Sequence, residues 1–215
     1  MIDQNLKLWD QIATSHESTT PLDLEPYLAE IARCARVLEV GSGYGRVLAH
    51  LRDLGFANVY GLDGSAVMIN RAMCSGHTRV LVGSLAELPF ENDSFDCILC
   101  IATLSSVPRS GVRQDAICEI ARVLRSGGIL LFRDFAITLR GPRVWRYVRN
   151  FALHLRPFGN FISEEGIEFH HFYHREVRKL IDRAGLSLLG LVPESFTTMH
   201  GNPSRGFTVY AAKRC

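Results

Sequence analysis

Three glycines at alternate positions follow an apolar run in the segment VLEVGSGYGR, residues 37–46. Where a strand turns into a helix, the helix start leaves unpaired backbone N–H groups, and Gly41, Gly43 and Gly45 keep side chains away from this turn. The pattern is G-x-G-x-G, whereas dinucleotide folds hold a pyrophosphate with G-x-G-x-x-G. Glu39 adds to this difference, because a carboxylate beside the turn repels phosphate and attracts a cationic or amino group. The segment therefore predicts a site for a ligand without phosphate.

A second carboxylate ends the next predicted strand, NVYGLD at residues 58–63. Parallel sheets bind ligands at the carboxyl ends of their strands. Asp63 is therefore placed to accept hydrogen bonds from the two hydroxyls of a ribose. A nucleoside with an amino acid tail and no phosphate satisfies the glycines, Glu39 and Asp63 together. S-adenosylmethionine has this chemistry, and these residues predict it as the cofactor.

The same residues carry a resemblance to a known family. LEVGSGYGR and GLDGSAVMI are similar to the first and second motifs of the class I S-adenosylmethionine-dependent methyltransferases. GSLAELPFENDSFDCILC resembles the family's third-to-fourth-strand segment, and EIARVLRSGGILLFRDF resembles its fifth-strand segment. The resemblance covers roughly residues 30–135 and keeps the order and spacing of the motifs. A dinucleotide-binding or other Rossmann-like domain is the alternative.

The resemblance implies a cofactor site residue by residue. It places Glu39, Gly41, Ser42, Gly43 and Gly45 around the methionine part, Asp63, Gly64 and Ser65 at the ribose, and Ser84 and Leu85 along the adenine. Family members often carry an aspartate where Ser84 stands, and serine can still form a hydrogen bond there but brings no charge. Residues 1–34 are expected to form a cap that closes over the cofactor as a lid. For Trp9 within that cap, plain packing is the alternative.

The acceptor side needs a nucleophile aligned with the methyl group and, if that nucleophile is protonated, a group that accepts its proton. Asp134 ends the fifth predicted strand, on the rim where the acceptor is expected. The tail also resembles a group of uncharacterised bacterial methyltransferases, whose histidine falls at His171. His171 and Asp134 are therefore the predicted catalytic residues. Other candidates are His170, His174, His200 and Asn202, and a structural or solvent-facing role is the alternative for each histidine.

Strand-like and helix-like segments alternate along the chain. The predicted strands are residues 36–40, 58–63, 79–83, 95–102 and 129–135, and the predicted helices are 22–34, 45–54, 65–74, 114–124 and 173–185. This alternation predicts an α/β fold with a Rossmann-like doubly wound sheet, mostly parallel, and helices on both faces. The last two strands, 186–192 and 205–213, are joined by a loop and should pair antiparallel. We expect one domain over residues 1–215, with an acceptor-side insert at 136–172.

The composition is that of a globular protein, with 47% hydrophobic and 21% charged residues. No apolar run reaches the ~18 residues that span a bilayer, and the N-terminal residues lack the layout of a signal peptide. We therefore expect a cytoplasmic protein without a membrane partner. Cys97 and Cys100 form a C-x-x-C inside a predicted strand, where residues three apart point to opposite faces. They should be buried thiols, and no metal site is predicted.

The insert carries a run of arginines. Arg140, Arg143, Arg146 and Arg149 recur every three residues, which puts them on one drifting face of a helix, and no acidic residue lies between Arg140 and Asn160. A solvated helix face, recognition of an anionic acceptor and an RNA backbone contact are the three interpretations. The tail is also loosely similar to transfer-RNA cytosine methyltransferases. We expect a small-molecule acceptor. The alternatives are RNA, a protein acceptor, and a non-catalytic role as a cofactor-binding partner protein.

Overall fold

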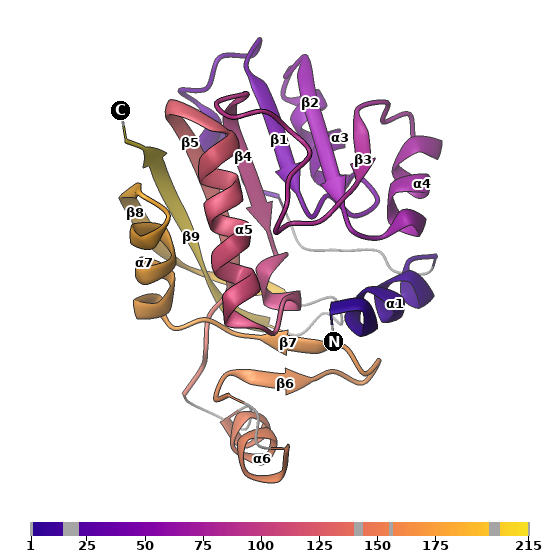
Figure 1. Cartoon of the computed structure of the whole chain (residues 1–215), viewed down its shortest axis with the longest axis vertical. Helices are drawn as coiled ribbons and strands as arrows, with labels where there is room; N and C mark the ends of the chain where they lie inside the picture. Colours follow the sequence, from indigo (N-terminus) through magenta and orange to yellow (C-terminus); the bar gives the residue numbers. More distant parts are fainter. Residues whose placement is uncertain (1, 15–21, 140–143, 155–156, 198–202, 215) are drawn as a thin grey trace.

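The computed structural model describes residues 2–14, 22–139, 144–154, 157–197 and 203–214 (Figure 1). Its helices are α1 (Ile2–Ile12), α2 (Glu25–Leu28), α3 (Arg46–Asp53), α4 (Ala66–Cys74), η1 (Leu104–Ser106, a 3-10 helix), α5 (Ser110–Val123), α6 (Val144–His154) and α7 (His174–Arg183). Its strands are β1 (Arg36–Val40), β2 (Asn58–Asp63), β3 (Val80–Val82), β4 (Phe95–Ile101), β5 (Leu124–Phe135), β6 (Asn160–Ile162), β7 (Glu168–His170), β8 (Leu186–Thr197) and β9 (Pro203–Lys213).

Seven strands form one sheet in the order β3-β2-β1-β4-β5-β9-β8. The first five run parallel, β9 pairs antiparallel with β5, and β8 pairs antiparallel with β9. Chain order reverses between β1 and β4, and a doubly wound sheet binds its ligand at the carboxyl ends of such a pair. The predicted sheet, with its antiparallel last strands, is confirmed.

Helices cover both faces of the sheet because alternate strand residues enter two separate cores (Figure 1). Val37 packs with residues of α2, α3 and α4, and its neighbour Leu38 packs with residues of α5 and α7. The two cysteines of β4 follow the same rule. Cys97 lies in the first core and Cys100 in the second, both fully buried, so the prediction of two buried thiols on opposite faces is confirmed.

Two expectations about elements are wrong. The helix predicted over residues 22–34 is only α2, because the chain after Leu28 forms turns, with Ile31 N donating to Leu28 O and Ala35 N to Ala32 O. The loop predicted between the last strands is shorter, because β8 continues to Thr197 and β9 begins at Pro203. Polar residues made this stretch resemble a loop. In the structure, however, Glu194 is held by hydrogen bonds within the sheet and forms an ion pair with Arg133.

The insert after β5 contains α6 and the two-stranded β6–β7 sheet, which crosses below the main sheet in Figure 1. Residue pairing alternates along this small sheet, with Asn160 opposite His170 and Phe161 opposite Phe169. One of its faces therefore carries polar residues and the other carries aromatic residues.

Candidate active site

The glycine turn joins β1 to α3 at the carboxyl edge of the sheet. Gly41 N and Ser42 N both donate to Leu62 O, at 2.7 and 3.0 Å, which ties the turn to the end of β2. Gly41, Gly43 and Gly45 all have positive φ, of 78°, 51° and 89°, a region that disfavours other residues.

The three glycines differ in what surrounds them. A Cβ at Gly41 would lie 2.2 Å from the Thr103 side chain, and one at Gly45 would lie 2.6 Å from the His77 ring. A Cβ at Gly43 would meet no atom within 4 Å. That a ligand approaches the turn at all three glycines stays a prediction. Gly41 and Gly45 allow close packing, and only Gly43 faces open space.

Glu39 is buried, with 2% of its surface exposed, and its Oε2 has no hydrogen-bond partner among the described residues. Burial raises the pKa of this carboxyl well above its usual range; Asp63 adds to the increase, and Arg46 opposes it. A buried carboxylate oxygen without a hydrogen bond is costly. A cationic amino group in front of Oε2 would satisfy it and favour the ionised form.

Asp63 connects the ends of two loops at the same edge. Its Oδ2 accepts from Gly43 N and its Oδ1 from Ser65 N, both at 2.8 Å. Burial raises the pKa of Asp63, while these backbone N–H groups lower it. Each carboxylate oxygen keeps further lone-pair capacity, so two hydroxyl donors can also be accepted. Ser65 caps α4 as its type predicts, because its hydroxyl accepts from Met68 N at 3.0 Å.

Helix α1 covers this turn. Leu6 leaves only 3.1 Å for a Cβ at Gly64, and Ser65 Oγ donates to a carboxylate oxygen of Asp10. Farther along α1, the half-buried Trp9 meets Phe169 edge to ring, with centroids 6.2 Å apart. The predicted cap therefore lies on the residues expected at the ribose. That it opens and closes as a lid stays a prediction.

The residues expected along the adenine follow β3. Ser84 is exposed, and its hydroxyl accepts from Ala86 N at 3.2 Å. Leu85 is half-buried and packs against the core that contains Leu88. Ser84 is therefore the exposed polar side chain of this pair.

His171 follows β7 and is buried among aromatic rings. Its Nδ1 lies 2.6 Å from Tyr147 Oη on α6. Its ring stacks on Phe135 with centroids 5.5 Å apart and meets Phe161 nearly at right angles at 4.8 Å. Phe135 ends β5, so the histidine lies at the carboxyl edge of the sheet. The partner Tyr147 is fully buried, and no sequence motif connects it to His171.

Asp134 has a different environment. Its Oδ2 accepts from Ser105 N at 3.0 Å and its Oδ1 from Phe135 N at 2.8 Å, so it holds η1 against the end of β5. Burial raises its pKa to about 6. The carboxylate is 1% exposed. Both hydrogen bonds therefore fix the backbone around the predicted rim.

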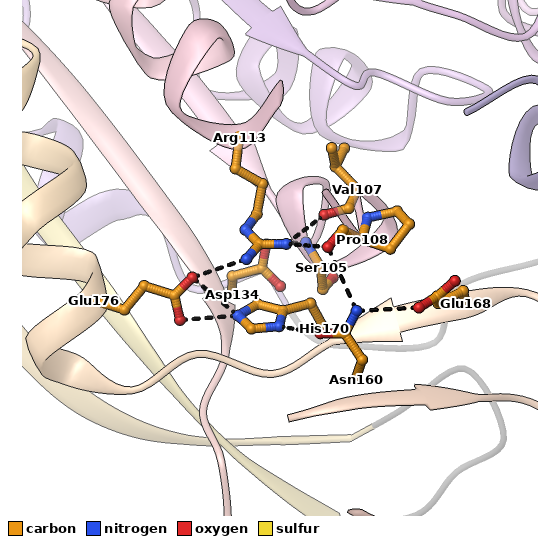
Figure 2. Close-up of polar contacts among 9 residues, drawn as sticks. All are labelled: Ser105, Val107, Pro108, Arg113, Asp134, Asn160, Glu168, His170 and Glu176. Atoms are coloured by element: carbon orange, nitrogen blue, oxygen red, sulfur yellow. Dashed lines mark hydrogen bonds and ion pairs between the residues drawn. The ribbon is translucent and has the colours of Figure 1, made fainter. Parts of the chain in front are cut away.

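The neighbouring histidine belongs to a polar network on the other face of β7 (Figure 2). His170 Nδ1 lies 2.6 Å from Asn160 Oδ1, and His170 Nε2 lies 2.8 Å from Glu176 Oε2. Arg113 donates to Glu176 at 2.9 Å and to the carbonyls of Val107 and Pro108. Both nitrogens of His170 are thus occupied, and burial lowers its pKa. His174 is exposed at the start of α7, while His200 and Asn202 lie outside the described residues.

Sequence reasoning also missed Asn5, which joins α1 to the insert. Its amide nitrogen donates to Ser106 O at 2.9 Å and to Glu168 O at 2.8 Å, and its oxygen accepts from Glu168 N at 3.0 Å. Thr103 was missed too. Its hydroxyl donates to Val40 O at 3.2 Å, beside Gly41. Neither residue stands in a motif, so only the folded chain identifies them.

Within the described ranges, no group of three or more histidine, cysteine or acidic residues is arranged to hold a metal ion. In the same part of the chain, no helix has the length and apolar character to cross a membrane.

A sheet that reverses its order beside a glycine turn, with one carboxylate at the end of each adjacent strand, defines a Rossmann-like domain for a nucleoside cofactor. The model of the methyltransferase domain family matches residues 38–132. A SAM-dependent methyltransferase from Methanosarcina mazei superposes with a TM-score of 0.83 and 25% identity, over 90% of this chain and 99% of that one. The matched region is that of the class I S-adenosylmethionine-dependent methyltransferases, and S-adenosylmethionine is the cofactor of this class.

Two curated relatives match part of the chain. Sarcosine/dimethylglycine N-methyltransferase of Aphanothece halophytica is 34% identical over 111 residues, which cover 46% of this chain and 37% of that protein. Fatty-acid O-methyltransferase of Mycolicibacterium smegmatis is 36% identical over 103 residues, which cover 46% of this chain and 36% of that protein. The chain spans little more than a third of the length of either relative.

Proposed function

We propose that this protein transfers a methyl group from S-adenosylmethionine to a small-molecule acceptor. The observation that carries the proposal is the buried Glu39 carboxylate, whose Oε2 has no hydrogen-bond partner in the described part of the chain and which lies beside the glycine turn. An amino acid tail supplies the ammonium group that this oxygen lacks.

The residues present fit the cofactor. Glu39 would hold the amino group, the open space at Gly43 would admit the methionine part, and Asp63 would accept the ribose hydroxyls. When bound, S-adenosylmethionine supplies a methyl group on a positively charged sulfur. The chain's own task is to exclude water and to align the acceptor with that methyl group.

The acceptor side is formed by aromatic residues from four elements or their ends. His171 and Phe135 stack at the end of β5, Phe161 and Phe169 stack across the β6–β7 sheet at 5.8 Å, and Trp9 approaches from α1. Phe135, Phe169 and Trp9 are half-buried, so each offers ring surface to a bound molecule. A flat or apolar small molecule is favoured on such a surface.

His171 is proposed as the group that accepts a proton from an O–H or N–H acceptor. In the tautomer in which Nδ1–H donates to Tyr147 Oη, the lone pair lies on Nε2, as a general base requires. Asp134 is proposed to act through position, because its carboxylate fixes η1 and β5 relative to each other.

A small molecule is favoured over RNA for two reasons. Arg149 of the arginine run is exposed on the side of α6 away from the buried Tyr147, next to the apolar side chain of Trp145. In addition, both curated relatives described above are named for small-molecule acceptors. Their names differ in acceptor and in methylated atom, so the proposal extends only to the size class.

Calorimetry with S-adenosylmethionine tests the cofactor site. We expect micromolar binding, and we expect Asp63→Ala to weaken it by about 1–3 kcal/mol, the scale of hydrogen bonds to a charged group. Glu39→Gln should weaken it similarly, and Asp182→Asn, a change at an exposed acid of α7, should leave it unchanged. Binding of NAD in place of S-adenosylmethionine would contradict the proposal.

Methyl transfer is tested with labelled cofactor and cell extract divided into small-molecule, RNA and protein fractions. We expect label in the small-molecule fraction. Label only in RNA would make RNA the acceptor, and cofactor binding with label in no fraction would favour a non-catalytic partner protein.

A further inference from the structure

Helix α6 presents an apolar face to solvent. Trp145 is 73% exposed and Phe151 is 55% exposed, Ala152 is exposed, and Val144 and Val148 are half-buried. At 3.6 residues per turn, these five positions fall within an arc of roughly 120°. Such an arc is normally the side of a helix that enters a core.

The core-facing side of α6 is a different one. Tyr147 is fully buried, Asn150 is 3% exposed, and both lie outside that arc. Phe151 meets Phe158 with ring centroids 6.4 Å apart, yet still exposes more than half of its surface. The helix is therefore already docked through its own buried side, and its apolar face is available to something else.

The sequence around this face is rich in positive charge. Exposed Arg149 borders the arc. Five arginines and no acids occur from Arg140 to Asn160, and subtracting these five from the net charge of +2 leaves −3 for the rest of the chain. A partner of this face should therefore be apolar and anionic at once, and it should avoid the remaining surface.

The position of α6 meets that condition. It lies at the end of the molecule's long axis, beyond β6 and away from the main sheet (Figure 1). A flat surface can contact α6 without contacting the rest of the molecule, which carries the net negative charge.

We propose that α6 binds the surface of an anionic lipid bilayer, with its apolar face in the boundary between headgroups and acyl chains. Trp, Phe and aliphatic residues on one side, with arginine at the border, are the features of helices that lie in this boundary. RNA fits less well, because the aliphatic Val144, Val148 and Ala152 offer no ring on which a base can stack. The sequence-based expectation of no membrane partner considered only spanning segments, and an interfacial helix of 11 residues does not span.

The test is co-sedimentation of the full chain with vesicles of phosphatidylcholine alone or mixed with phosphatidylglycerol, at low and physiological salt. We expect binding to the mixed vesicles that weakens as salt increases. The double variant Trp145→Ala with Phe151→Ala should bind at least roughly tenfold more weakly. The matched control is Met73→Ala with Leu189→Ala, which removes two apolar residues elsewhere that are each 57% exposed, and it should bind normally.

A second readout does not depend on removing the apolar residues. The chain has two tryptophans, so Trp9→Phe leaves Trp145 as the only one. Its emission should shift to the blue when mixed vesicles are added, and Arg149→Glu should reduce the shift at equal lipid. Circular dichroism of each variant checks that it is folded.

Three results would overturn the proposal. The first is an absence of vesicle binding by the folded wild type, or equal binding by the double variant. The second is a dimer in solution that Trp145→Ala dissociates, since the face would then bind a second copy. The third is binding to a transfer-RNA mixture that requires Trp145 while vesicles give no signal.

Discussion

The hydroxyl of Tyr147 lies 2.6 Å from Nδ1 of His171, and this contact joins the centre of α6 to the edge of the main sheet. We predict that Tyr147→Phe destabilises the protein by about 1–2 kcal/mol, because it leaves a buried imidazole nitrogen without its partner. Urea unfolding measures this. In a methyl-transfer assay the variant should also lower kcat more than it raises KM for the acceptor. Unchanged stability and activity would show that the contact has no role.

The control for that prediction is Tyr173→Phe, a change at the exposed tyrosine that precedes α7. It removes the same hydroxyl from a site where no buried partner is lost. Its free energy of unfolding should stay within about 0.5 kcal/mol of the wild type.

Glu39 should destabilise the cofactor-free protein as pH rises. Its pKa is higher in the folded chain than in the unfolded chain, because burial disfavours the charged form. Above the unfolded pKa of 4.5, the folded state therefore binds more protons than the unfolded state. The free energy of unfolding falls as pH rises from that value through the raised pKa of the folded state. At pH 8, Glu39→Gln should unfold at a higher denaturant concentration than the wild type. At pH 4 the difference between the two should be smaller. Equal shifts at both pH values would contradict this reasoning.

Asp134 gives a second pH prediction with a narrower window. Its pKa rises from 3.8 to about 6 on folding, so its contribution to stability decreases as pH rises between about 4 and 6. The difference in unfolding free energy between Asp134→Asn and the wild type should therefore change across this range and be flat above it. Using the difference removes the contributions of other acids, such as Glu176, whose pKa is lowered. A difference that is constant from pH 4 to 7 would contradict the assignment to Asp134.

The glycine turn allows a paired test. Gly41→Ala places a methyl group 2.2 Å from Thr103 in the close-packed end of β1, so it should destabilise the fold by several kcal/mol. Gly43→Ala meets no atom, so only its positive φ should cost about 1 kcal/mol. Cofactor affinity, measured on the folded Gly43→Ala protein, should still fall because the methyl group occupies the approach to the turn. A normal affinity would place the cofactor elsewhere.

Much of the fold could be predicted from the sequence because the signals that determine it are local. The strand ending at Val40, the strand ending at Asp63 and the cap at Ser65 depend on residue type within a few positions, and the structure has all three where predicted. The polar stretch near Glu194 was wrongly predicted to be a loop. Glu194 is paired with Arg133, which is 61 residues away in the sequence, so no local signal indicates this contact.

The histidines show the same limit inside the candidate site. His170 and His171 are neighbours in sequence, yet the first points to Glu176 and the second to Tyr147. Only the pairing of β7 with β6 decides which face each one takes. The different tasks of Gly41 and Gly43 depend likewise on Thr103, which no motif connects to the turn.

Asn5 bonds to the backbone of Glu168, 163 residues later in the chain. During synthesis α1 leaves the ribosome before Glu168 does, and it cannot make these bonds until Glu168 has also emerged. At ordinary rates of translation this delay is roughly 10–30 s. Helix α1, which lies against Gly64 and Ser65, is therefore made well before it can take its place in the fold.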